Sequence, residues 1–218
     1  MAQSTPKWRR NPAERPRQIL TAALEVFGEA GVARSTLDEI AERAGVSKGT
    51  IYLYFPNKEE LFRQTIRAAL TPTDRPAETP ARASATRQLL DTVERQWQFL
   101  TSPDGVVISR LVSAEQWQFP ELSELYGEEV VSKFAQELAP IIRRGTATGE
   151  FRELEPAHAA RMLTALVVHS AMWRETTASP SASRKPGDAV LRELTDFYLQ
   201  AIAPTEGAFP QADGAPNH

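Results

Sequence analysis

The chain has 218 residues and no cysteine; 41% of the residues are hydrophobic, 24% are charged, and the formal net charge is −3. This composition is typical of a globular protein with a packed core and excludes an intrinsically disordered chain. The lack of cysteine excludes a disulfide framework, a zinc site with cysteine ligands and a thiol nucleophile.

The first segment of the chain is basic and is not followed by an apolar stretch. Residues 1–20 carry five Lys or Arg residues and a single acidic residue, Glu14. A signal peptide needs an apolar stretch behind its basic residues, so we expect none here. We interpret residues 1–16 as a flexible basic arm; the alternative is a solvated charged tail without a partner.

The first two predicted helices are short and have clear end signals. Apolar residues recur with helical spacing over residues 17–29. Thr36 and Glu39 then have the spacing of a capping box, which predicts a second helix; Ser35 and Asp38 offer an alternative register. Gly45 ends this helix, and we expect its backbone to have a positive φ angle.

Two more helices follow at once. Ser47 can cap a third helix over about residues 47–53, and Asn57, with Glu60 three residues later, can cap a fourth over about residues 58–70. The second and third helices are joined by a tight turn that contains glycine, which is the layout of a helix-turn-helix motif.

The rest of the chain is also predicted to be helical. A segment rich in Pro and Thr, residues 71–81, breaks the helical pattern and marks a boundary. The spacing of apolar residues after it predicts five helices and no strand. These helices are expected at residues 82–100, 106–117, 121–144 with a bend at Pro140, 156–176 and 188–203, with a loop at 178–187.

The predicted fold class is therefore all-α, with two domains. A helix-turn-helix domain is expected at residues 17–62, and a helix that continues to about residue 70 links it to the second domain. The second domain, residues 71–203, is larger and helical. A flexible tail is expected at residues 204–218.

The helix-turn-helix region resembles a known family. The run from Gly31 to Leu61 contains the pieces IA (40–41), AGVS (44–47), GTIY (49–52), YF (54–55) and KEEL (58–61). Together these pieces resemble the DNA-binding headpiece of the TetR/AcrR family of transcriptional regulators. The resemblance implies a three-helix N-terminal domain that binds a double-stranded DNA operator. It also implies that the larger C-terminal domain binds a small-molecule effector and forms a homodimer.

The first turn of the third predicted helix lies where a recognition helix meets the bases. The residues there are Ser47, Lys48, Gly49 and Thr50. Other residues offer a hydroxyl group, an ammonium group or a helix N-terminus to phosphate. These are Thr36, Tyr52, Tyr54 and Lys58. Tyr52 could instead be a core aromatic residue, and Lys58 a plain exposed residue. The arginines of the basic arm could reach a minor groove or only add phosphate affinity.

An effector pocket is expected among bulky and polar residues of the central helices. The candidates are Trp97, Arg110, Trp117, Phe119, His169 and Trp173. Arg110 could bind an anionic ligand or pair with a glutamate such as Glu115. His169 has the alternative interpretation of a core or interface histidine.

The last two predicted helices carry wide apolar stripes. Paired with the same helices of a second chain, they would form a four-helix bundle. The candidate dimer residues are Leu163, Leu166, Val167, Val190, Leu194, Phe197 and Tyr198. The same stripes could also build the core of a single chain, and the two interpretations are compatible.

Motifs of catalysis are missing from the sequence: it has no HExxH, GxSxG or phosphate-loop pattern, so we expect neither an enzyme nor a cofactor. The most apolar run, residues 162–173, is shorter than the roughly 20 residues that span a bilayer. We therefore expect a cytoplasmic protein, and the resemblance to the TetR/AcrR family implies a regulator, by default a repressor that an unknown small molecule releases from a palindromic operator. The alternative is a helical interaction module or ligand-binding protein without operator-specific DNA binding.

Overall fold

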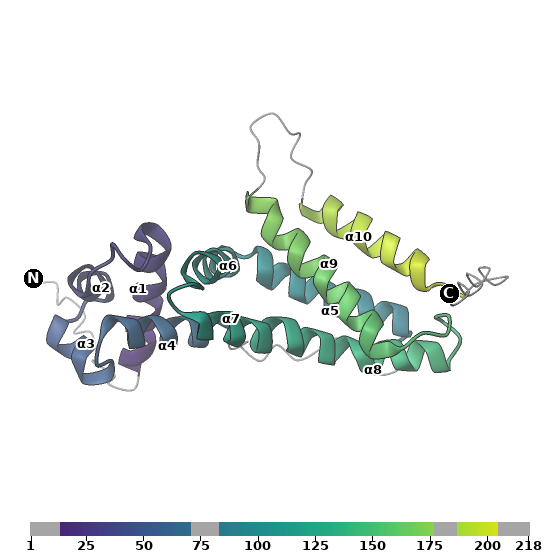
Figure 1. Cartoon of the computed structure of the whole chain (residues 1–218), viewed down its shortest axis with the longest axis horizontal. Coiled ribbons are helices and arrows are strands. Elements are labelled where there is room, and N and C mark those ends of the chain that lie inside the picture. The colour runs from purple at the N-terminus through teal and green to yellow at the C-terminus, as the bar shows by residue number, and fades with distance from the viewer. Residues whose placement is uncertain (1–13, 71–82, 177–186, 205–218) are drawn as a thin grey trace, which may run out of the picture. The chain divides into compact units, whose positions relative to one another are not determined.

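A computed structural model describes residues 14–70, 83–176 and 187–204 (Figure 1). In these ranges the chain consists of helices and their connections, with no strand, which confirms the predicted all-α class. Several predicted features lie outside the described residues: most of the basic arm, the Pro- and Thr-rich segment 71–81, nearly all of the loop 178–187, and the tail after Pro204. No helix within the described ranges is long and apolar enough to cross a membrane.

The contacts divide the described chain into two compact units. The first unit combines the residues before the gap at 71–82 with Pro103–Glu129, and the second combines residues 83–102 with the chain from Val130 onward. Residues 103–129 are part of the larger C-terminal domain that the sequence predicts. In this division they pack with the first unit, because its core continues into this segment.

The first unit is built around its first helix. The helices of this unit are α1 (Arg15–Ala30), α2 (Leu37–Ala44), α3 (Lys48–Tyr54), α4 (Lys58–Leu70), α6 (Pro103–Glu115) and α7 (Pro120–Tyr126). Helix α1 contacts α2, α4 and α6. At the centre, the rings of Phe27 and Phe62 meet edge to face with centroids 5.2 Å apart. Both side chains are fully buried, as are those of Ile19, Ile40 and Ile51.

Local hydrogen bonds set where the short helices begin. The Thr36 hydroxyl accepts from the amide of Glu39 at 3.2 Å, and the Glu39 carboxylate accepts from the Thr36 amide at 2.8 Å, so the capping box is confirmed. The Asn57 side chain accepts from the Glu60 amide at 2.7 Å and starts α4. Gly45 has φ 64°, as predicted, because the turn after α2 needs the left-handed region.

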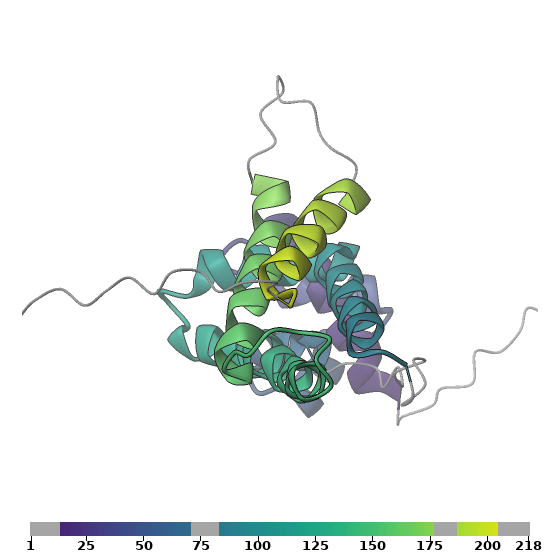
Figure 2. The same ribbon diagram turned by 90° about the vertical axis from the view of Figure 1, so that its right-hand side faces the viewer.

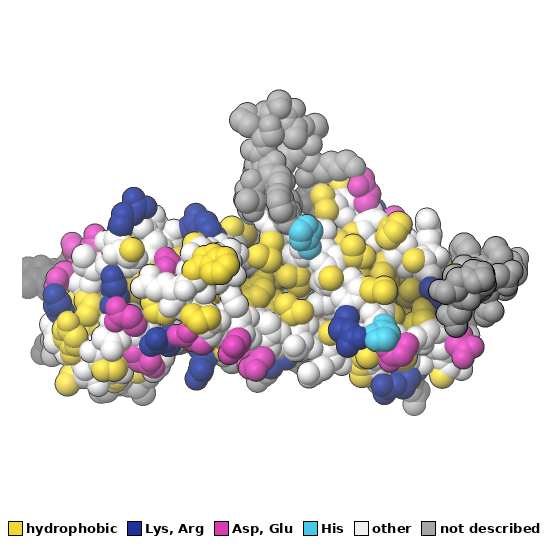
Figure 3. Space-filling view, viewed as in Figure 1, with side chains coloured by type: hydrophobic (Ala, Val, Ile, Leu, Met, Phe, Trp, Pro, Cys, Tyr) yellow, Lys and Arg dark blue, Asp and Glu magenta, His cyan; other side chains and the backbone are white. Residues whose placement is uncertain are grey.

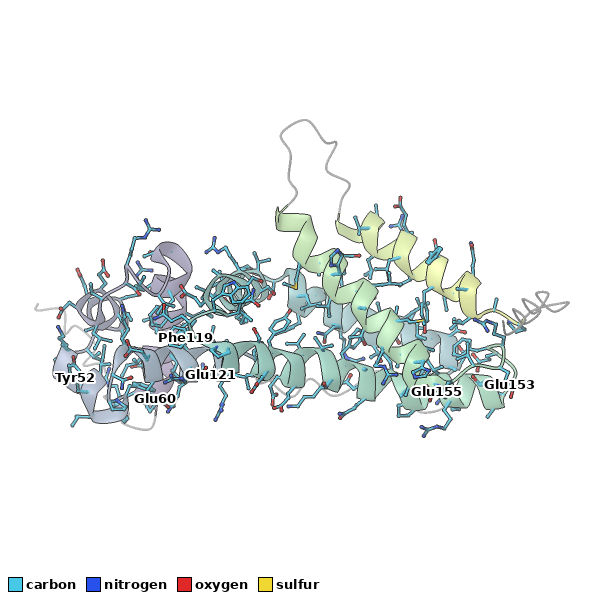
Figure 4. The ribbon with its side chains drawn as sticks, in the orientation of Figure 1. Tyr52, Glu60, Phe119, Glu121, Glu153 and Glu155 are labelled. Carbon is cyan, nitrogen blue, oxygen red and sulfur yellow. The ribbon has the colours of Figure 1, made fainter. Side chains whose placement is uncertain are left out.

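Helices α6 and α7 lie against α1 and α4 through specific contacts. The Arg110 guanidinium donates to the carbonyl oxygen of Gly28, near the end of α1. The Phe119 ring, which precedes α7, meets the Phe62 ring edge to face at 5.4 Å. Arg63 of α4 pairs with Glu121 of α7 at 2.6 Å, and Figure 4 shows Phe119 and Glu121 close to α4. These contacts explain why the segment belongs to the first unit.

The second unit is a bundle of four helices: α5 (Ala85–Thr101), α8 (Lys133–Ala147), α9 (Pro156–Thr176) and α10 (Gly187–Ile202). Helices α5, α8 and α9 contact one another, and α10 lies against α9 and α5 (Figure 2). The core side chains include Leu89, Trp97, Leu138, Leu163 and Val167.

The predicted helix at residues 121–144 is not uniform. A π-helical segment, Gly127–Ser132, separates α7 from α8, and the division between the two units falls within it. Pro140 lies inside α8 as expected. A π-helical segment leaves no simple signal in the spacing of apolar residues, so the sequence indicated only the proline.

Candidate nucleic-acid interface

Helix α3 presents one buried and several exposed side chains. Ile51 is the buried residue of the helix and fixes which side faces the core. The next three residues are exposed, with 51% of Tyr52, 80% of Leu53 and 37% of Tyr54 accessible. Figure 4 shows Tyr52 on α3, outside the body of the unit. The structure therefore places both predicted tyrosines on an open surface, and the alternative of a core Tyr52 is excluded by its exposure.

The start of α3 is fixed by two hydroxyl groups. The Ser47 hydroxyl accepts from the Thr50 amide at 3.1 Å and shares a second hydrogen bond of 2.8 Å with the Thr50 hydroxyl. A Cβ built on Gly49 would meet only the Ser47 hydroxyl oxygen, at 3.8 Å. The fold thus leaves room for a side chain at Gly49, and its absence opens the backbone to a partner.

Lys48 is held by an acidic residue of the preceding helix. Its ammonium nitrogen lies 2.8 Å from a carboxylate oxygen of Asp38, and both side chains are exposed. The hydrogen bond to Asp38 raises the pKa of Lys48, so the group is charged. An exposed ion pair of this kind is weak. The pair therefore orients Lys48 at the junction of α2 and α3 while leaving its charge available to a phosphate or a base.

Lys58 has a different environment from the one expected. Its ammonium group donates to the carbonyl oxygens of Val32, Ser35 and Ala33, at 2.8, 3.1 and 3.4 Å. The three donors of an ammonium group are thus directed into the turn between α1 and α2. In this structure Lys58 stabilises that turn, and a phosphate would have to compete with the turn for the charge.

Thr36 is also engaged locally. Its hydroxyl and its amide both bond Glu39, at 2.8 Å in each case. The residue is exposed at the start of α2, but the two groups expected to bind phosphate are part of the capping box.

The six residues predicted to line an effector pocket have separate environments. Arg110 bonds the Gly28 carbonyl, and Phe119 packs on Phe62, so both belong to the first unit's helix contacts. Trp97 is buried in the second unit, whereas Trp117 is 91% exposed between α6 and α7. His169 is exposed on α9, and the Trp173 side chain lies outside the described part of the structure. The environment of each residue depends on which helix packs opposite it, so the spacing of residues in the sequence could not predict these environments.

The predicted dimer residues divide into two groups. Leu163, Val167 and Tyr198 are buried within the chain, and the Tyr198 hydroxyl donates to the Ala159 carbonyl at 2.8 Å. Burial raises the pKa of Tyr198 to about 12. Val190 and Leu194 are half-buried. Leu166 and Phe197 are exposed, to 38% and 66%.

Met162 is a further exposed hydrophobic residue, and it is not among the dimer residues predicted from the sequence. It lies four residues before Leu166 on α9, which is one helical turn, and is 66% exposed. We call Met162, Leu166 and Phe197 the apolar surface of α9 and α10; Figure 3 shows hydrophobic side chains on the face that carries these helices.

Three comparisons relate this chain to known proteins. Residues 19–65 match the family model of bacterial regulatory proteins, tetR family, and residues 87–204 match the model of the AefR-like transcriptional repressor, C-terminal domain. The HTH-type transcriptional regulator YdeS of Bacillus subtilis is 34% identical over 139 residues, which cover 62% of this chain and 66% of YdeS.

A second relative and a solved structure extend the likeness. The fatty acid metabolism regulator protein of Bacillus subtilis is 27% identical over 150 residues, or 67% of this chain and 75% of that protein. A candidate transcriptional regulator from Saccharomonospora viridis, solved in complex with choline, is 26% identical with a TM-score of 0.68; the match covers 88% of this chain and 98% of that one.

Proposed function

The chain belongs to the TetR family of bacterial regulatory proteins and is a DNA-binding transcriptional regulator, not an enzyme; we propose that it is a homodimeric repressor that a small molecule releases from a palindromic operator. Such a repressor would act in the bacterial cytoplasm, where its operator lies.

The observation that carries the proposal is the open face of α3. Ile51 fixes the helix on the core, so Lys48, Gly49, Thr50 and Tyr52 remain available to a major groove. Lys48 supplies a charged donor, and the hydroxyls of Ser47, Thr50 and the two exposed tyrosines supply groups for phosphates or base edges. A helical interaction module without operator binding would have no use for this combination.

The dimer part of the proposal rests on the apolar surface of α9 and α10. Met162, Leu166 and Phe197 expose large hydrophobic groups that the chain's own core does not cover. Burial of such groups against a second copy would lower their contact with water and pair the helices as a four-helix bundle. A two-fold dimer presents its recognition helices about 34–36 Å apart, which is why the operator is proposed to be palindromic.

The effector part of the proposal rests on the second unit and on the relatives. Residues 87–204 match a repressor's C-terminal domain, one relative regulates fatty acid metabolism, and one similar structure holds choline. We propose a small molecule that binds the DNA-incompetent state of the dimer more tightly and so shifts the population away from the operator.

Selection from a pool of random duplex DNA, at two salt concentrations, tests the proposed DNA binding. We expect a palindromic consensus and an affinity that falls steeply with salt, because Lys and Arg contacts to phosphate release counterions. Only weak, sequence-independent binding would contradict the operator and favour the alternative, a helical ligand-binding protein.

Two variants test the proposed face of α3. Lys48→Ala and Tyr54→Phe should each weaken binding to the selected duplex, by about 5- to 100-fold for the lysine if it contacts a base. Both residues are exposed, so the dimer should stay intact in analytical ultracentrifugation. Normal binding by both variants would show that the interface lies elsewhere.

A further inference from the structure

The side of α3 that faces away from the core carries two residues without polar side chains, Gly49 and Leu53. Successive residues of an α-helix are about 100° apart, so the position directly opposite the buried Ile51 falls between Gly49 and Leu53. These two residues are four apart and lie on the same side of the helix. Neither has a role in the core: Gly49 is exposed and Leu53 is 80% exposed.

The two residues together form one surface feature. A helical side chain leans toward the N-terminus of its helix, so the Leu53 methyl groups extend toward the turn that contains Gly49. Gly49 has no side chain to cover that turn, and a Cβ there would meet nothing closer than 3.8 Å. The result is a leucine side chain beside bare backbone, at the part of α3 farthest from the core.

The flanking residues of α3 are polar, but Leu53 is not. Thr50 and Tyr52, on either side of the pair Gly49 and Leu53, carry hydroxyl groups that can bond phosphates or base edges. Leu53 has neither a donor nor an acceptor, so it gains nothing from a phosphate. Among the groups that base pairs present in the major groove, the apolar one is the C5-methyl group of thymine.

We infer that Leu53 is a specificity-determining residue that selects thymine in the operator by contact with its C5-methyl group, and that Gly49 permits the close approach this contact needs. The inference rests on the proposed function, because it requires α3 to enter the major groove. It names the chemical group that the helix recognises, the thymine methyl group. It also names a contact residue, Leu53, that the spacing of the motif did not indicate.

Replacement of thymine by uracil in the selected duplex tests this inference directly, because uracil lacks only the methyl group. Each thymine of the half-site is replaced in turn, together with its symmetry mate, and binding is measured by fluorescence anisotropy. We expect one position at which uracil weakens the wild-type protein, by about four-fold per half-site if one methyl group is buried. Leu53→Ala should bind the thymine and uracil duplexes equally at that position.

A matched variant separates the methyl contact from a general change in α3. Tyr52→Phe alters the neighbouring exposed residue and should keep the full uracil effect. Specific binding that is insensitive to uracil at every position overturns the inference, as does an equal uracil effect in the wild type and Leu53→Ala. Failure to select any specific duplex overturns the proposed operator binding as well, so the two failures are distinguishable.

Discussion

Two lysines near the helix-turn-helix motif have opposite environments. Lys48 is paired with one exposed carboxylate, from Asp38. Lys58 donates to three backbone carbonyl oxygens of the turn between α1 and α2, and two of these bonds are 3.1 Å or shorter. A backbone carbonyl oxygen that has no hydrogen-bond donor destabilises the folded state when water cannot take the donor's place. We therefore expect Lys58 to act on the stability of the headpiece and Lys48 to act on DNA binding.

Replacement of Lys58 by methionine tests this division. Lys58→Met keeps the length of the side chain but removes the three donors, and should lower the free energy of unfolding by about 1–2 kcal/mol. Urea denaturation followed by circular dichroism measures the change. Without urea, where the variant is folded, the salt dependence of operator binding should stay the same, since no phosphate contact is lost.

Lys48→Met is the matched control for the same chemical change. It should leave the unfolding free energy nearly unchanged, because an exposed ion pair contributes little. Its operator binding should weaken, with a smaller dependence on salt if the lysine contacts phosphate. If Lys58→Met instead reduced the salt dependence without loss of stability, the sequence-based expectation of a phosphate contact would be supported.

At the scale of elements, glycines decide how closely two segments approach. Gly145 in α8 is buried, and a Cβ there would lie 2.2 Å from the Phe151 ring and 3.0 Å from the Ala85 Cβ. Glu150 makes a second contact between the same segments: its carboxylate accepts from the amides of Ala85 and Thr86 at 3.0 and 3.1 Å. The start of α5, the end of α8 and the connection to α9 thus meet through one small residue.

We expect Gly145→Ala to destabilise the second unit. The added methyl group cannot be accommodated without moving the Phe151 ring, and overpacking of this kind costs about 1–3 kcal/mol. Urea denaturation at a fixed protein concentration measures the loss, since the stability of a dimer depends on concentration.

Gly127→Ala is the control for the change from glycine to alanine in a helical backbone. Gly127 has φ −59° and ψ −40°, and a Cβ there would meet nothing within 4 Å. We expect no loss of stability, and a gain of up to about 1 kcal/mol from helix propensity. Equal effects of the two substitutions would show that the close contact at Gly145 relaxes without cost.

At the scale of the whole molecule, the proposal requires two chains. Part of each apolar stripe of α9 and α10 is core, and part stays exposed on the single chain. Large exposed hydrophobic groups on adjacent helices are typical of a protein–protein interaction surface. We propose that the partner is a second copy of the chain.

Leu166→Glu and Phe197→Glu test the proposed dimer. A carboxylate buried in an apolar interface is unfavourable, so each variant should weaken association by about 30-fold or more. Sedimentation equilibrium measures the association, and circular dichroism should show unchanged helix content. Operator binding should fall with it, because one headpiece contacts only one half-site.

Trp117→Glu provides the control at the same scale. Trp117 is 91% exposed between α6 and α7, so the same charge is placed on a large apolar residue outside the proposed interface. We expect it to leave the dimer intact. Dimers that persist in both Leu166→Glu and Phe197→Glu would show that the subunits associate through another surface.

The sequence by itself determined the all-α class, the caps of α2, α3 and α4 and the family. These features depend on residues three or four positions apart, such as Thr36 with Glu39 and Asn57 with Glu60, or on one residue's backbone preference, such as Gly45. Local interactions of this kind can be read directly from spacing.

Only the tertiary structure decided where long-range partners lie. Arg110 bonds the end of α1, Phe119 packs on α4, and Lys58 reaches the turn before α2; none of these contacts could be predicted from the spacing of residues. The physical reason is that a side chain's role depends on which element packs opposite it. An arginine or a phenylalanine suits a ligand pocket and a helix contact equally well, and only the fold chooses between them.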